Sequence, residues 1–310
     1  MRASDYEILY DLPEGEYDGR GVEGVRTTSI RAGRSMELMI HPKAEITEGL
    51  KREVKRRKST PAMEKINARN RERAMMRLIE ANFTEAAVVS TLTYAYPVED
   101  YGMMNLAELA ETYLKRGLPW DYVDAKREMR NMLERLKRRV VKAGGKPSDL
   151  KWNVVTEEGE KEPVPGLPRK LHHHCIFEGP GITPEVVEEC WRAGRSQNAR
   201  FDLENDGAAR LARYFTKQKR GGRWWTHSRN LKKPVPVVSD RKISRRRLML
   251  LAADIQKNGR EILEKLYPDY KVVELPDVKY SDFLPGAYIY VRMRKKGGGG
   301  MPWERARIRN

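Results

Sequence analysis

The amino-acid sequence predicts an α+β protein built around an antiparallel sheet with helices on one face. Short β-branched runs alternate with longer segments in which apolar residues recur every three or four positions. Along the centre of the chain their order is strand, helix, strand, strand, helix, strand. Glycine and proline separate the runs. This order is typical of a split βαβ, or ferredoxin-like, unit.

The first half of this unit follows from capping residues and periodicity. A helix is expected over 61–81, because a serine or threonine can cap it and a proline suits its first turn. The β-branched run 87–94 predicts a buried strand. A second helix is expected over 122–142, where apolar residues recur at helical steps until Gly144 and Gly145 end it.

The second half of the unit follows from the same capping residues and periodicity. The expected elements are strands at 152–157 and 171–177, a helix opened by Thr183 and Pro184, a helix over 207–218 and a strand over 223–226. The loop before the second of these strands is rich in proline, which ends strands rather than continuing them.

We expect four segments in the whole chain. Residues 1–58 show neither helical nor strand periodicity and end in a basic run, so they predict a flexible N-terminal arm. The other segments are a folded domain (59–238), an extension (239–294) with a helix near 248–266 and a strand near 288–291, and a disordered glycine-rich tail (295–310).

Composition favours a nucleic-acid partner. The 310 residues carry a net charge of +17, from 61 Lys and Arg against 44 Asp and Glu. Each cation placed against a phosphate releases a counterion, and an anionic membrane surface is the alternative partner. Two cysteines without metal or disulfide spacing fit a reducing compartment. No apolar run approaches the ~18 residues that span a bilayer. We therefore expect a cytoplasmic protein without a membrane partner.

Three consecutive histidines lie in the strand expected at 171–177. Side chains alternate along a strand, so His172 and His174 share one face and His173 points to the apolar one. Two imidazoles at i and i+2 suit a divalent ion. Glu157 closes the preceding strand, and a hairpin would bring it near His172, giving a three-ligand site with open positions. The alternative is that the histidines form only a polar strand end.

Tyr214 is a candidate nucleophile on the helix expected over 207–218. It falls beside the apolar stripe of that helix, so it need not fill the core. Lys217 follows one turn later, where it can favour the phenolate or neutralise phosphate charge. The Y-x-x-K spacing by itself arises often by chance.

Taken together, these features resemble the HUH endonucleases, the rolling-circle replication initiators (Rep) of phages, plasmids and integrative elements. That family has three ordered motifs, and the chain matches each of them. They are a strand ending T-L-T (Ser90-Thr91-Leu92-Thr93-Tyr94), His-hydrophobic-His (His172-His173-His174) and a helical Y-x-x-K (Tyr214-Phe215-Thr216-Lys217). Order and separations match over roughly residues 60–235. His173 departs from the aliphatic residue usual at that position, and one tyrosine in the third motif resembles the single-tyrosine enzymes.

The resemblance implies a metal-dependent DNA endonuclease that nicks and rejoins. His172, His174 and Glu157 would hold a divalent metal ion (Mg or Mn) that polarises the scissile phosphate. Tyr214 would attack, forming a 5′-phosphotyrosine and leaving a 3′-OH to prime rolling-circle replication. Lys217 would orient Tyr214 or offset its negative charge. The ester keeps the bond energy, so no nucleotide cofactor is expected.

Basic residues interleaved with aromatic ones follow the candidate nucleophile. In single-stranded DNA, charges track phosphates and rings stack on bases. We expect DNA contacts from Arg223, Trp225, Ser228, Arg229, Asn230, Lys232 and Lys233. The alternative is that the tryptophans are core residues and the lysines are solvated.

The expected partner is single-stranded DNA at a replication origin. Because the sequence shows no phosphate-loop motif, unwinding and synthesis are expected to need a host helicase and polymerase. A relaxase or a single-tyrosine transposase of a mobile element is an alternative with the same chemistry. A non-catalytic nucleic-acid-binding module is an alternative of another class, which explains the charge but not the convergence of histidines, carboxylate and tyrosine.

Overall fold

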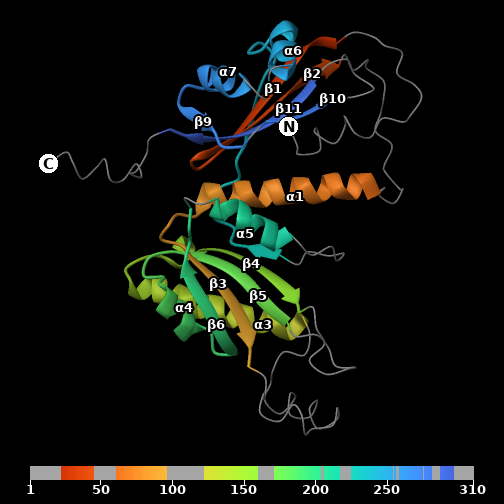
Figure 1. Ribbon diagram of the computed structural model, residues 1–310. Helices are drawn as coiled ribbons and strands as arrows, with labels where there is room; N and C mark the ends of the chain where they lie inside the picture. Colours follow the sequence, from red (N-terminus) through yellow and green to blue (C-terminus); the bar gives the residue numbers. More distant parts are fainter. Residues whose placement is uncertain are drawn as a thin grey trace, which may run out of the picture. The chain divides into compact units, whose positions relative to one another are not determined.

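The computed structural model describes residues 22–44, 61–95, 122–159, 171–203, 206–216, 225–253, 255, 258–274, 276–280 and 287–296. The chain divides into two compact units (Figure 1). One, called the central unit here, is Arg57–Pro234, and the other, the terminal unit, combines Met1–Arg56 with Val235–Asn310. Each unit contains an antiparallel sheet, so the predicted antiparallel α+β class is confirmed.

The central unit is an alternation of helices and strands. Its elements are α1 (Pro61–Asn82), β3 (Val88–Tyr94), α3 (Tyr122–Lys142), the 3-10 turn η4 (Pro147–Asp149), β4 (Lys151–Glu158), β5 (Leu171–Glu178), α4 (Pro184–Cys190), β6 (Gly194–Arg200), α5 (Gly207–Thr216) and β7 (Trp225–His227). The strands lie in the order β6-β3-β5-β4-β7, and every neighbouring pair is antiparallel.

Two crossovers interlock in this sheet. β3 and β4 both run antiparallel to β5, which lies between them, so they point the same way, and α3 lies between them in the sequence. β5 and β6 enclose β3 in the same manner, with α4 between them in sequence. Each crossover is therefore split by one antiparallel strand, and β5 occupies the middle of the sheet.

Helices cover both faces of the central sheet, so the prediction of helices on one face is wrong (Figure 1). α3 and α4 pack on one face, against Leu92 and Phe177 among others. α1 and α5 pack on the opposite face, against Val155 and Ile176. The second layer arises because α1 and α5 lie outside the strand–helix repeat in sequence, and each contributes its own apolar stripe.

The fourth strand of the split unit is β6, which the sequence pattern missed. The prediction placed that strand at 223–226. Of these residues the structure describes 225 and 226, which belong to the short β7 at the opposite edge. β6 has no large apolar residue, so it shows no alternation of hydrophobic and polar positions. Its first residue, Gly194, lies so near β3 that a Cβ would be 2.1 Å from the carbonyl oxygen of Thr93. Only glycine fits there.

The terminal unit joins both ends of the chain in one sheet. Its elements are β1 (Val22–Ala32), β2 (Ser35–Ala44), β8 (Pro236–Ser239), α6 (Arg245–Ala253), α7 (Gly259–Leu266), β9 (Tyr270–Val272), β10 (Asp277–Tyr280) and β11 (Ala287–Lys295). The strand order is β10-β11-β2-β1-β8, and β9 pairs with β11. The helix expected near 248–266 is therefore two helices, and the strand expected near 288–291 lies within β11.

The prediction of a flexible arm is wrong for residues 22–44, which form the β1–β2 hairpin. Gly33 makes its tight turn with a φ of 55°. Alternate residues of β2, among them Leu38 and Ile40, are fully buried in a core shared with α6, α7 and β11. β1 and β2 find their other partners more than 190 residues along the chain, which local periodicity does not reveal. The rest of the arm and the tail from 297 lie outside the described residues.

None of the helices in the described part of the chain is long and apolar enough to cross a membrane.

Replacing Leu38 by alanine tests whether this hairpin belongs to a core. Leu38 is fully buried, so the Leu38→Ala variant should lose about 2–5 kcal/mol of unfolding free energy from the terminal unit. Urea denaturation measures the loss. Val237→Ala, at a β8 position that is 61% exposed, is the matched control and should change stability little. Equal stability of the two variants would contradict the assignment of β2 to the core.

Candidate metal centre

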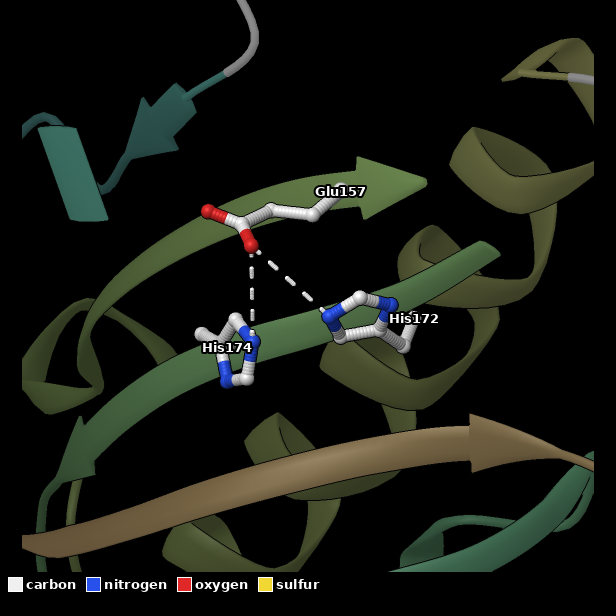
Figure 2. A group of neighbouring side chains, drawn as sticks. All are labelled: Glu157, His172 and His174. Atoms are coloured by element: carbon white, nitrogen blue, oxygen red, sulfur yellow. Dashed lines mark ion pairs between the residues drawn. The ribbon is translucent and has the colours of Figure 1, made fainter. Parts of the chain in front are cut away.

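A carboxylate and two imidazoles meet on one face of the central sheet (Figure 2). Glu157 near the end of β4 lies directly opposite His172 of β5 in the strand register. His174 is two residues further along β5, so alternation places it on the same face as His172. Each of the three residues offers one potential ligand atom, and these three atoms all lie within 4.8 Å of one another. These three residues could hold a metal ion.

The distances within the cluster suit shared coordination. Oε2 of Glu157 lies 3.7 Å from Nε2 of His172 and 3.7 Å from Nε2 of His174. These separations are only slightly wider than those of two ligands that each lie about 2.1 Å from one ion. Glu157 is 7% exposed, and a buried carboxylate is costly unless positive charge or hydrogen bonds compensate it. A divalent cation between these atoms would supply that charge.

The His174 ring is in the neutral form that can bind a metal ion. Burial, and then the neighbouring His172, lower the pKa of His174 to about 3, so it carries no proton charge at neutral pH. Its Nδ1 lies 3.2 Å from Oγ1 of Thr91. If Nδ1–H donates to that hydroxyl, the lone pair remains on Nε2. Nε2 is buried and has no hydrogen-bond partner among the described residues. Such an orphaned nitrogen fits a metal ligand.

Thr91 supports His174, although the sequence shows it only as part of the first motif. It lies opposite His174 in the pairing of β3 with β5. The contact depends on the register of two strands whose contacting residues are 83 positions apart in the sequence. A hydroxyl at alternate positions of β3 was the only sequence signal that could have suggested it.

His173 faces the other side of the sheet and is satisfied there. Its Nε2 lies 2.6 Å from the Tyr94 hydroxyl, and its Nδ1 lies 2.9 Å from Oγ1 of Thr156. Its ring also lies nearly perpendicular to that of Trp191 in a T-shaped contact. The ring is fully buried, and this burial, more than the neighbouring histidines, lowers the pKa of His173 to about 3. Both ring nitrogens are in use, so His173 acts as a packing residue of the α3 side.

Tyr214 lies against the cluster. Its ring meets the His174 ring edge-on, with centroids 4.3 Å apart and planes at 89°. α5 buries Ala208, Ala212 and Phe215, and this packing fixes the helix while Tyr214 at its side stays 48% exposed. The fold therefore brings the candidate nucleophile beside one of the candidate metal ligands.

The predicted DNA contacts fall into three groups. Arg223 lies outside the described residues, as does Lys217, the predicted catalytic lysine. Trp225, 39% exposed, pairs with Val155 across β7 and β4, which puts it on the face of the metal cluster. The remaining five residues, Ser228, Arg229, Asn230, Lys232 and Lys233, follow β7 in the chain.

Some residues of that last group stabilise the fold through hydrogen bonds. The Ser228 hydroxyl accepts a hydrogen bond from the Trp152 amide, and Ser228 is buried. The Asn230 side chain donates to the backbone carbonyls of Ser148 and Leu150. The Lys232 backbone is held by the Asn82 side chain. The side chains of Arg229, Lys232 and Lys233 are exposed, so they are the ones open to a phosphate backbone.

Comparison of the chain with protein-family models, with curated proteins and with solved structures gives no match.

Removing one ligand should abolish the response to a divalent ion. At Mn²⁺ concentrations about 100-fold above the dissociation constant, binding should stabilise the chain by about 2.7 kcal/mol, which raises the unfolding temperature by roughly 5–10 °C. His174→Ala and Glu157→Gln should lose this rise in a thermal melt. His227→Ala, at a half-buried histidine of β7, is the matched control and should keep it. An undiminished rise in His174→Ala would place the ion elsewhere.

The middle histidine should behave in the opposite way. His173→Ala removes two buried hydrogen bonds and leaves the Tyr94 hydroxyl without its imidazole partner, which should cost roughly 2–5 kcal/mol of unfolding free energy. The Mn²⁺-dependent rise in melting temperature should remain. Loss of the metal response without loss of stability would show that His173, rather than its neighbours, is the ligand.

Proposed function

We propose that the protein is a single-tyrosine endonuclease of the HUH type, which nicks single-stranded DNA and initiates rolling-circle replication. The observation that carries the proposal is the edge-on contact between Tyr214 and His174, because it joins a nucleophile to a cluster that suits a metal ion. Basic charge explains a nucleic-acid partner but gives no reason for this convergence.

The environments of the two parts suit different tasks. Glu157 and His174 are buried, whereas Tyr214 is half-exposed. A nucleophile must reach a strand that arrives from solvent, while metal ligands must hold one geometry. The Tyr214 ring contacts the His174 ring on one side, so the phenol lies near the cluster.

The reaction exchanges one phosphodiester for another. A divalent ion held by Glu157, His172 and His174 would supply Lewis-acid polarisation of the scissile phosphate. The Tyr214 phenol loses its proton to solvent, and its oxygen forms a bond to phosphorus. The bond from phosphorus to the 3′ oxygen breaks, and that oxygen takes up a proton. The products are a 5′-phosphotyrosine and a free 3′-OH, and the reverse exchange rejoins the strand without a nucleotide cofactor.

The topology supports the same reading. The histidines lie on β5, the middle strand of a sheet with split crossovers, which is the arrangement expected of a ferredoxin-like HUH core. Central strands are the least mobile part of a sheet, so they suit a site that needs fixed ligands. A host helicase and polymerase would then open and copy the duplex, since nicking provides only the primer end.

Covalent capture on DNA tests the proposal. The full chain is incubated with a randomised pool of labelled single-stranded oligonucleotides and Mn²⁺, then run on a denaturing gel. We expect a labelled protein band that Tyr214→Phe abolishes while DNA binding persists. Tyr280→Phe, at a tyrosine of β10 that is 64% exposed, is the control and should keep the band.

A band of equal strength in Tyr214→Phe would reject Tyr214 as the nucleophile. Retention of DNA by the unaltered chain without any covalent band, over a wide range of oligonucleotides and metals, would favour a non-catalytic binding module instead.

A further inference from the structure

The residues around the metal cluster lie in cross-strand rows that continue to the edge of the sheet. In the first row, Glu157 of β4 lies opposite His172 of β5, which lies opposite Thr93 of β3, which lies opposite Arg195 of β6. Residues directly opposite each other in antiparallel strands share a face. Arg195 is therefore on the face of the candidate metal site.

A second row runs beside the first. Val155 of β4 lies opposite His174, which lies opposite Thr91 and then Gln197 of β6. The hydrogen-bond distance between Thr91 and His174 independently places this row on the same face. Arg195 and Gln197, two residues apart on β6, are thus the outermost members of the two rows.

Both rows change from buried to exposed in the same direction. In the first row, Glu157 is buried and His172 is half-buried, whereas Thr93 and Arg195 are exposed. In the second row, Val155 and His174 are buried, Thr91 is half-buried and Gln197 is exposed. Among the described residues, this face of the sheet is therefore covered at β4 and open at β6.

The two faces of β6 are used differently. Asn198 donates hydrogen bonds to Ser196 and to the Pro184 carbonyl at the start of α4, so these alternate residues fasten the strand to the α4 side. The side chains of Arg195 and Gln197 point the other way. Within the described part of the chain they form no ion pair or hydrogen bond. A guanidinium with several donors and no partner among the described residues, placed beside a candidate phosphodiester site, suits a phosphate oxygen.

We propose that single-stranded DNA reaches the site across the β6 edge, where Arg195 binds a backbone phosphate next to the scissile one and Gln197 contacts the same strand. The inference rests on the proposed function for its substrate class. Arg195 lies two strand spacings from His172, roughly 10 Å, so it serves a neighbouring phosphate rather than the reacting one. It is a positioning residue, and its contribution is electrostatic and independent of base sequence.

Binding measured without cleavage tests this path. The full chain, in chelator so that no reaction competes, is titrated into fluorescent oligothymidylate at a series of salt concentrations, and anisotropy gives the dissociation constant. Arg195→Ala removes one phosphate contact, so affinity should fall on the order of fivefold at about 0.1 M salt. The slope of log affinity against log salt should shrink by about 0.7.

Two matched variants sharpen the experiment. Arg192→Ala removes the same charge three residues earlier, at an exposed position before β6 begins, and should bind like the unaltered chain. Arg195→Lys keeps the charge and should restore the salt slope while recovering only part of the affinity, because lysine lacks the bidentate fork. Thermal melts should be equal for all three, since both side chains are exposed.

The possible outcomes distinguish the proposed path of single-stranded DNA across β6 from the proposed nicking reaction. Equal binding by Arg195→Ala and Arg192→Ala would overturn the path, even if the unaltered chain forms a covalent adduct. A specific loss in Arg195→Ala for a chain that never forms an adduct would keep the path and reject the endonuclease. An equal loss on a blunt DNA duplex would overturn the assignment of this edge to a single strand.

Discussion

The register in which β4 pairs with β5 fixes the geometry of the whole candidate metal centre. It sets Glu157 opposite His172 on one face and Thr156 opposite His173 on the other. A slip of one residue would send every side chain to the wrong face. His173 opposes such a slip, because its two nitrogens contact Thr156 of β4 and Tyr94 of β3 at once. The middle histidine therefore ties three strands together from the core side, and this fixes its two neighbours as a pair on the opposite side.

Helix layers on both faces of the sheet bury the side chains of β5 on each side. α3 and α4 bury the side that holds His173, while α1 and α5 bury the side that holds the cluster. Burial favours neutral imidazoles, as the lowered pKa of His174 reflects, and neutral imidazole is the form that binds metal. α5 has a second part in the site, since the same packing that covers the sheet brings Tyr214 to His174. On the proposed function, one helix thus both shields the ligands and carries the nucleophile.

Local sequence patterns predicted the parts of the fold in which residue types recur with a regular helical or strand period. The alternation of His172, His173 and His174 follows from strand geometry alone, and α3 follows from its apolar spacing. β6 was missed because an exposed edge strand needs no apolar residue. The β1–β2 hairpin was missed because its partners β8 and β11 come from the far end of the chain. Thr91 contacts His174 through the register of β3 with β5, and Arg195 reaches the same face through the register of β3 with β6. No single segment encodes these registers. The helix layer over the cluster was missed because periodicity shows that a helix has an apolar stripe but not which face of a sheet receives it.

On the proposed function, one tyrosine beside a metal cluster forms an ester with DNA. Mass spectrometry of the protease-digested adduct formed with single-stranded DNA and a divalent ion identifies the linked residue. The modified peptide should contain Tyr214 and carry the 5′-phosphate of the fragment downstream of the nick. An adduct on another residue, or one joined through a 3′-phosphate, would contradict the proposed function.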